Sequence, residues 1–352
     1  MLSQTPEPVL LDAWQKAKAA DPGARTRDIA DMLGVPEGLV LEARTGREVR
    51  RLGLKGPEFI GVLEALKGVG SVMTLTRNDA CVHETTGEIG EVAAHGAMGQ
   101  VVGEIDLRLF LKQWHVGYAI EEETRSGLRH SVQVFDTTGR AVIKIYASVD
   151  TDMVAWEQSL APYLDMETSV AAFSPAPPKT RDAPDSEIDV EVLREQWQAL
   201  EHSHDFHKML RELSVGREQA LRLAGGDLAS RIRNDVLERL LRLAAEKAVP
   251  IMCFVGNPGC IQIFSGEIQT VQMMGPWLNV MDPKFNLHLR TDRAAGAWVV
   301  RKPTSLRGVI TSLELFDADG ELICQFFGAR PPGEGEREAW REIVKTAIGA
   351  GS

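Results

Sequence analysis

The stretch that decides the fold is VMTLTRNDACVHETTGEI, residues 72–89, because the chain repeats it as IMCFVGNPGCIQIFSGEI at residues 251–268. The offset between these two copies is 179 residues. A second block, VFDTTGRAVIKIYAS at 134–148, matches LFDADGELICQFFGA at 315–329 with an offset of 181 residues. Two independent blocks at nearly one offset indicate an internal duplication, so each half predicts the architecture of the other.

Each copy lies in a longer unit of helices followed by short strands. TRDIADMLGVPEGLVLEA, at 26–43, predicts a helical start with Thr26 as a candidate N-cap. The matching helical region of the second half runs from 193–213 to 234–248. The TTG and ADG turns predict hairpins between apolar strands. Closing helices are expected at 152–164 and 336–350. This order predicts an α+β fold of two domains, each a large, mainly antiparallel sheet with flanking helices.

A proline-rich segment separates the two halves. SPAPPKTRDAPDSE, residues 174–187, carries four prolines, which remove backbone donors and favour extended conformations. We therefore expect a first repeat over residues 1–173, a linker over 174–187 and a second repeat over 188–352.

The composition narrows the class of protein. A chain of 352 residues with 44% hydrophobic and 25% charged residues is typical of a globular protein with a substantial core. The net charge of −11 argues against a nucleic-acid partner. No apolar run reaches 18 residues and the N-terminus does not resemble a secretory signal, so no membrane insertion is expected. The cysteines lack paired spacing and predict reduced thiols in the cytoplasm. They are Cys81, Cys253, Cys260 and Cys324.

Three histidines crowd into EHSHDFHKML, residues 201–210, within a segment whose apolar spacing favours one amphipathic helix or two consecutive helices. His204 and His207 are three residues apart and share a helix face, whereas His202 lies round the axis. The corresponding first-half segment has no histidine. A solvated polar face, a zinc site and an axial ligand for haem iron all remain open on these residues alone.

Several longer motifs resemble the cytoplasmic haemin transport or haemin-degrading factor family (HemS-like) of Gram-negative bacteria. They are DLRLFLKQWHVGYA (106–119), GNPGCIQIFSG (256–266), GPWLNVMDPKFNLHL (275–289), RKPTS (301–305) and SLELFDADG (312–320). The resemblance covers essentially the whole chain. It implies two stacked repeats, with haem (iron protoporphyrin IX) held in a cleft between them.

The resemblance also implies roles for individual residues. Counting back from Arg217-Glu218-Gln219-Ala220, His204 is the expected axial ligand and His207 an alternative one. Arg108 is the expected distal residue, and catalytic if the protein is an enzyme. The remaining implied contacts are Phe110 in the pocket lining, Arg217, Lys302 and Arg330 toward the propionates, and Gln325 and Phe327 on the strand facing the haem.

Two positions raise questions within this resemblance. Many relatives carry tyrosine where this chain has Phe327, so a hydroxyl group near the haem is lost. His83 lies where some relatives have been proposed to hold a second haem, but a surface histidine at a strand end is the favoured interpretation.

The implied function is haem uptake for iron acquisition. We expect a cytoplasmic protein that binds haem and passes it to a haem oxygenase, with an inner-membrane haem ABC importer as the possible donor. The alternative is an enzyme that opens the porphyrin ring and releases iron. No flavin or nicotinamide motif is present, so that reaction would need a reductase or another external reductant.

Overall fold

The computed structural model describes residues 7–124, 127–164, 170–178, 182–331 and 333–349. The chain forms two compact units. The first comprises Met1–Arg77, Glu84–Pro178 and Gly256–Gln262, and the second comprises Asn78–His83, Lys179–Val255 and Ile263–Ser352. Each unit therefore includes a short segment from the other half of the sequence, which the expected repeat boundaries do not take into account.

Three short helices begin the first unit: α1 (Glu7–Ala20), α2 (Thr26–Leu33) and α3 (Glu37–Glu42). The prediction that Thr26 caps α2 is wrong, because Arg25 holds the N-cap position and Thr26 is already helical. The Thr26 hydroxyl group instead accepts a hydrogen bond from Arg44 at 3.1 Å. Gly34 ends α2 in the left-handed region, with φ of 68°, where glycine carries no Cβ penalty.

The main strands of the first unit are antiparallel neighbours in the order β1, β7, β8, β9, β2. Their bounds are Val49–Leu52, Val116–Thr124, Gly127–Phe135, Ala141–Thr151 and Gly70–Arg77. Trp156 and Leu160 of α5 (Met153–Leu160) bury against this sheet together with α4 (Ile60–Ala65). A meander of β4 (Glu91–His95), β5 (Met98–Val102) and β6 (Asp106–Phe110) completes the unit.

The second unit repeats this plan. Its main strands run in the order β10, β16, β17, β18, β11, again antiparallel. Their bounds are Ala229–Ile232, Gly296–Thr304, Gly308–Phe316, Leu322–Gly328 and Ile251–Asn257. A meander of β13 (Val271–Met274), β14 (Trp277–Met281) and β15 (Phe285–Arg290) follows the same pattern as in the first unit. The predicted α+β class with mainly antiparallel sheets is confirmed.

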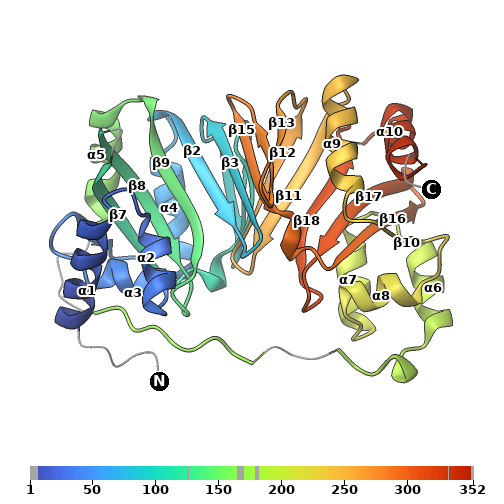
Figure 1. Cartoon of the computed structure of the whole chain (residues 1–352), viewed down its shortest axis with the longest axis horizontal. Coiled ribbons are helices and arrows are strands. Elements are labelled where there is room, and N and C mark those ends of the chain that lie inside the picture. Colours follow the sequence, from blue (N-terminus) through green and yellow to red (C-terminus); the bar gives the residue numbers. More distant parts are fainter. Residues whose placement is uncertain (1–6, 125–126, 165–169, 179–181, 332, 350–352) are drawn as a thin grey trace. The chain divides into compact units, whose positions relative to one another are not determined.

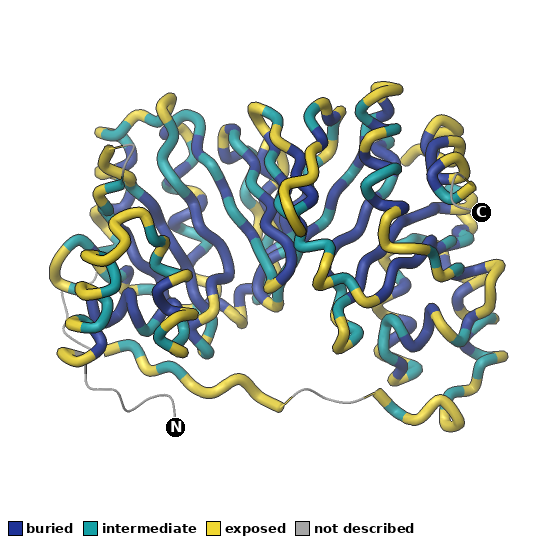
Figure 2. Tube along the Cα trace, in the orientation of Figure 1, coloured by how far each residue is buried: buried dark blue, intermediate teal, exposed yellow. Residues whose placement is uncertain are grey.

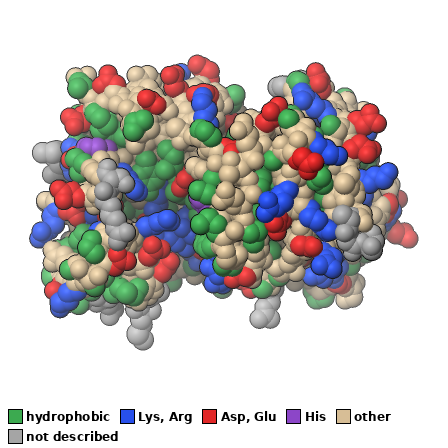
Figure 3. Space-filling view, turned by 45° about the horizontal axis from the view of Figure 1, so that its top comes forward, with side chains coloured by type: hydrophobic (Ala, Val, Ile, Leu, Met, Phe, Trp, Pro, Cys, Tyr) green, Lys and Arg blue, Asp and Glu red, His purple; other side chains and the backbone are tan. Residues whose placement is uncertain are grey.

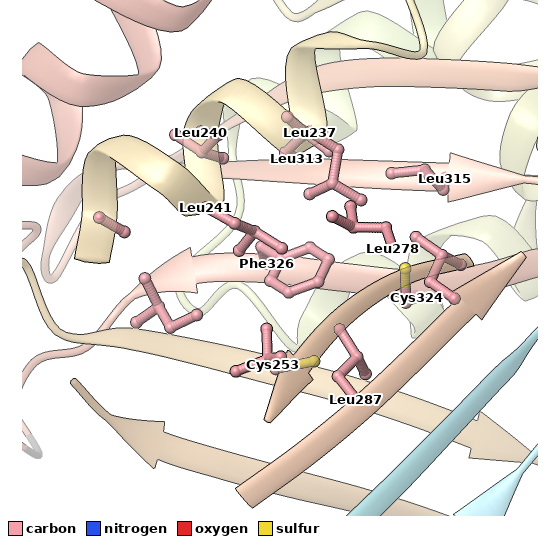
Figure 4. Packing of buried hydrophobic residues seen from close by; sticks show 14 of the residues in the cluster. Leu237, Leu240, Leu241, Cys253, Leu278, Leu287, Leu313, Leu315, Cys324 and Phe326 are labelled. Carbon is pink, nitrogen blue, oxygen red and sulfur yellow. The ribbon is translucent and has the colours of Figure 1, made fainter. Parts of the chain in front are cut away.

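Helices cover both faces of this second sheet (Figure 1). Helices α9 (Val236–Glu246) and α10 (Glu338–Gly349) pack on one face, where Leu240, Leu241 and Phe326 are fully buried (Figure 4). Helices α6 (Val190–Gln198), α7 (Asp205–Glu212) and α8 (Arg217–Leu223) pack on the other face. The expectation of consecutive helices around the histidines is confirmed. The chain trace is most deeply buried along the strands (Figure 2).

The repeated Asn-x-x-Cys turn explains how the exchanged segments are held. In the second unit, the Asn78 side chain accepts hydrogen bonds from the backbone of its own turn and donates one to the Ile323 carbonyl oxygen at 2.8 Å. In the first unit, Asn257 does the same and donates to the Val142 carbonyl oxygen at 2.8 Å. The turns precede β3 (Cys81–Gly87) and β12 (Cys260–Gly266).

None of the helices in the described part of the chain combines the length and apolar character that a membrane-spanning segment needs. On the face drawn in Figure 3, acidic and basic side chains are interspersed.

Candidate functional site

A buried carboxylate lies at the centre of the candidate site, on the α7–α8 face of the second unit. Glu314 on β17 has a side chain that is 0% exposed. Gln325 on β18 is its direct cross-strand partner. Alternate residues of a strand share a face, so Ser312 points to the same side as Glu314. Three neighbouring strands therefore bring polar groups to one place, because Lys302 on β16 also reaches this carboxylate.

Glu314 accepts hydrogen bonds from four side chains. Its Oε1 atom receives Lys302 Nζ at 2.9 Å, Ser312 Oγ at 2.8 Å and Gln325 Nε2 at 2.9 Å. Arg217 of α8 adds a bidentate contact, with Nε to Oε2 at 2.8 Å and Nη2 to Oε1 at 2.9 Å. A buried charge is costly unless it is paired and hydrogen-bonded, and this carboxylate meets both conditions.

The ionisation of this cluster follows from burial and neighbouring charges. Burial alone would raise the pKa of Glu314, but Arg217 and Lys302 outweigh it and hold that pKa well below its usual range. Burial lowers the pKa of Lys302 to about 8, with Glu314 opposing the change and Arg217 adding to it. At pH 7 the two cations and one carboxylate leave the cluster with one excess positive charge.

His207 joins the same cluster from α7. Arg217 Nη1 lies 3.3 Å from His207 Nε2. The residue as a whole is exposed, yet the protein around its ring, together with Arg217 and Lys302, lowers the pKa of His207 to about 4. The imidazole is therefore neutral at pH 7, and Arg217 is the donor in this contact. Beneath both cations lies the Phe206 ring, with its centroid 5.1 Å from the Arg217 guanidinium carbon and 4.9 Å from Lys302 Nζ.

His204 has a different environment from His207. It occupies the N-cap position of α7, and its side chain is 76% exposed. Its ring stacks on His202 with centroids 4.9 Å apart, and its Nε2 lies 3.5 Å from Asp205 Oδ1. Within the described part of the chain, no group of three His, Cys, Asp or Glu side chains is arranged to hold a metal ion. The geometry therefore gives the zinc interpretation no support.

Apolar side chains continue the sheet face next to the polar cluster. Phe327 on β18 pairs with Met252 on β11, and Gln325 pairs with Phe254. The Phe254 and Phe327 rings meet edge to face with centroids 5.2 Å apart. Both rings are partly exposed, as is Met252. This face thus offers an apolar surface beside a cluster of cationic groups, an arrangement that suits a ligand that is part apolar and part anionic.

The other expected site residues lie apart from this cluster or in the first unit. Arg330 is half-buried beyond the end of β18, and burial and the neighbouring Arg307 charge lower its pKa. Arg108 and Phe110 belong to β6 of the first unit. Arg108 is 39% exposed, forms an ion pair with Asp106 and donates to the Leu107 carbonyl oxygen at 3.0 Å.

The structure corrects the interpretation of His83 and adds a residue that sequence reasoning missed. His83 is fully buried rather than at the surface, packs against Phe285 with centroids 5.0 Å apart, and has its pKa lowered to about 3 by burial. The missed residue is Glu314. Two signals in the sequence point to Glu314. It is a charged residue within the apolar strand SLELF, and Lys302 lies on the preceding strand.

The duplicated position in the first unit carries different charges. Gln133 and Lys144 stand where the second unit has Glu314 and Gln325. Lys144 is buried and donates to Glu37 of α3 at 2.5 Å. The Gln133 amide group donates to Ser131 at 3.1 Å. Glu37 balances the charge of Lys144, and Arg77 is a further cation close to Lys144. The carboxylate at the centre of the second-unit cluster therefore has no counterpart at Gln133.

Comparisons with known proteins agree with the duplicated architecture. A family model described as the haemin-degrading HemS.ChuX domain matches the chain twice, over residues 34–163 and 214–347, which confirms the duplication. Hemin transport protein HmuS of Yersinia pestis is 38% identical over 341 residues, which cover 96% of this chain and 97% of that protein.

Two solved structures resemble the whole chain. One is holo-PhuS, a heme-binding protein from Pseudomonas aeruginosa, with 44% identity and a TM-score of 0.93, covering 97% of this chain and 99% of that one. The other is the heme degrading enzyme ChuS of Escherichia coli O157:H7, with 36% identity and a TM-score of 0.88, covering 97% of this chain and 99% of that one.

Proposed function

Because this chain belongs to the haemin-degrading HemS/ChuX domain family, we propose that it binds haem on the α7–α8 face of its second unit and serves in haem uptake for iron acquisition. The observation that carries this proposal is the buried Glu314 carboxylate, which gathers Arg217 and Lys302 beside the neutral imidazole of His207. Cations and an imidazole are the groups that recognise the propionates and the iron of haem.

The excess positive charge suits the propionates. Guanidinium and ammonium donors form charge-assisted hydrogen bonds to carboxylates, and a guanidinium can do so in a bidentate geometry. Arg217 and Lys302 are proposed to receive one propionate, and Arg330 to contact the edge of the ligand. Arg307 lies close to Arg330, and the Glu336 carboxylate opposes its effect on the pKa of Arg330.

Spacing supports His204 as the axial ligand. The carboxylates of haem lie at the ring edge, several ångströms from the iron at its centre. His207 Nε2 lies 3.3 Å from Arg217 Nη1, so a propionate bound to Arg217 would lie beside His207. The iron at the ring centre would then lie further from His207 than the propionate does. His204 lies three residues earlier, about 4.5 Å along the helix axis at 1.5 Å per residue. We propose His204 as ligand and His207 as its alternative.

The apolar surface would cover the porphyrin ring. Phe254 and Phe327 present partly exposed rings beside Gln325. Burying apolar surface stabilises a complex by about 25 cal/mol per Å² of area removed from water. The Phe327 side chain gives this surface no hydroxyl group, so it offers the ligand contact area alone.

We propose haem carriage rather than haem degradation as the main activity. Under this proposal the protein receives haem from an inner-membrane ABC importer in the cytoplasm and passes it to a haem oxygenase. The Escherichia coli relative ChuS is a heme degrading enzyme, which favours ring opening as the second candidate. Ring opening would then draw its electrons from an external reductant or reductase.

One experiment separates these activities. Haem is titrated into the purified chain, and ascorbate is then added in air with catalase present. Carriage predicts a Soret band that shifts on binding and persists after the reductant is added. Degradation predicts a bleached Soret band with release of iron and a linear tetrapyrrole. A chain that leaves the spectrum of free haem unchanged during the titration would contradict haem binding itself.

A further inference from the structure

We propose that Glu314 is a positioning residue that makes the haem site selective for a ligand carboxylate, an inference that rests on the proposed function. Glu314 would not touch the haem. It would act through Arg217 and Lys302, by keeping both side chains oriented and charged in a site with little water.

The geometry of Arg217 is the first support. Two of its nitrogens, Nε and Nη2, are committed to Glu314 at 2.8 and 2.9 Å. The remaining nitrogen, Nη1, points toward His207 at 3.3 Å, on the side of the cluster where a ligand would lie. Because Glu314 occupies one edge of the planar guanidinium group of Arg217, the other edge is available to a ligand carboxylate. The orientation is fixed before binding, so little side-chain entropy is lost on binding.

The charge of Lys302 is the second support. Its ammonium group is fully buried, 2.9 Å from Glu314 Oε1 and 3.4 Å from Ser312 Oγ. The charged groups near Lys302 are Glu314 on β17 and Arg217 on α8, and His207 approaches from α7. Of these, Glu314 alone favours the ammonium form. Without that carboxylate, burial and the Arg217 charge would lower the pKa of Lys302 further.

The duplicated unit supplies a natural comparison. Where Glu314 stands, the first unit has Gln133, and its neighbour Lys144 is held by Glu37 instead. No cation in that pair is left over for a ligand. The carboxylate on the central strand therefore distinguishes the second unit from the first at this position.

Glu314→Gln is the test, with haemin and haemin dimethyl ester as ligands. The ester keeps the iron and the ring but blocks both propionates. In the unaltered chain we expect haemin to bind more tightly than its ester at pH 7, and that preference to weaken above about pH 8 as Lys302 loses its proton. In Glu314→Gln we expect the preference to fall by roughly tenfold or more, and its pH midpoint to move lower.

Ser312→Ala is the matched control, because it removes one neutral donor to the same oxygen and leaves both cations paired. Near-ultraviolet circular dichroism checks that each variant is folded. If Glu314→Gln does not fold, the same titrations are made with Glu314→Asp. Glu314→Asp keeps the negative charge at this position, so this variant should retain part of the preference for haemin over its ester. An unchanged or larger preference for haemin in Glu314→Gln, or an equal loss in Ser312→Ala, would overturn the positioning role. Failure of the unaltered chain to bind either ligand would instead refute the proposed function.

Discussion

At the scale of single residues, His204 and His207 have different environments and different proposed roles. His204 is solvent-exposed at the N-cap, and His207 is held against Arg217. Their separation of three residues places both on one side of the helix start. Under the proposed function, His204 would be the imidazole available to the iron, while His207 lies in the cationic cluster.

The first prediction concerns His204. His204→Ala should weaken haem binding by about tenfold or more and change the ferric Soret spectrum, because the axial bond is lost or passes to His207. His207→Ala is the matched variant and should change the spectrum less. Absorption titrations of both variants check this, and an unchanged spectrum and affinity in His204→Ala would rule out the assignment.

The second prediction concerns the pH dependence of stability. The pKa of His207 falls from 6.5 to about 4 on folding, so between these values the unfolded chain binds more protons than the folded one. The stability that His207 contributes is present above about pH 6.5 and is lost as the pH falls toward 4. Because the residue is exposed, this loss should be no more than about 1 kcal/mol. Buried His83, whose pKa is lowered to about 3, adds to the same loss.

Urea unfolding at pH 7 and pH 5 measures this effect. The difference in unfolding free energy between the two pH values should shrink in His207→Gln, with His95→Gln as the control for replacing an exposed histidine. An identical difference in His207→Gln and in the unaltered chain would contradict the neutral state of His207 in the fold.

At the scale of elements, much of the structure was predictable and the site was predictable only in part. The repeated blocks predict the strands and the hairpin glycines, because an apolar pattern between turns is a local property. The contacts of Glu314 could not be predicted, because they depend on the register of β16, β17 and β18 and on the docking of α8. The surface interpretation of His83 is wrong because its strand is buried on both faces, so polar and apolar residues do not alternate cleanly.

The third prediction concerns the repeated turn. Asn78→Ala removes the side-chain oxygen that organises its own turn and the donor to the Ile323 carbonyl oxygen, so it should lower the unfolding free energy by about 1–3 kcal/mol. Asn257→Ala should cost a similar amount, because its contacts match. Denaturant titrations check both values, and a cost near zero for either would show that the turn does not depend on its asparagine.

At the scale of the whole molecule, the duplication has produced two units with one fold and unequal chemistry. The second unit has Glu314 with two cations, whereas the first has Gln133 at the duplicated position and pairs Lys144 with Glu37. His83, the candidate for a second site, lies fully buried against Phe285. We therefore predict that haem binds at the Glu314 cluster of the second unit.

The fourth prediction is accordingly a stoichiometry. Haem titration of the chain should end at one equivalent, because the cationic cluster belongs to one unit. His83→Leu should leave this end point unchanged while it perturbs packing against Phe285 by about 1 kcal/mol or more. Absorption titration with a protein concentration from amino-acid analysis gives the number. An end point of two equivalents that falls to one in His83→Leu would contradict the single site.

The exchanged turns carry a consequence for how such a chain arose. Each unit is completed by a short loop that belongs, in sequence, to the opposite half. A single-copy ancestor with the same turn would have lacked that piece unless a second molecule lent it. The duplication places both copies of the loop in one chain, so each unit receives its loop without a second molecule.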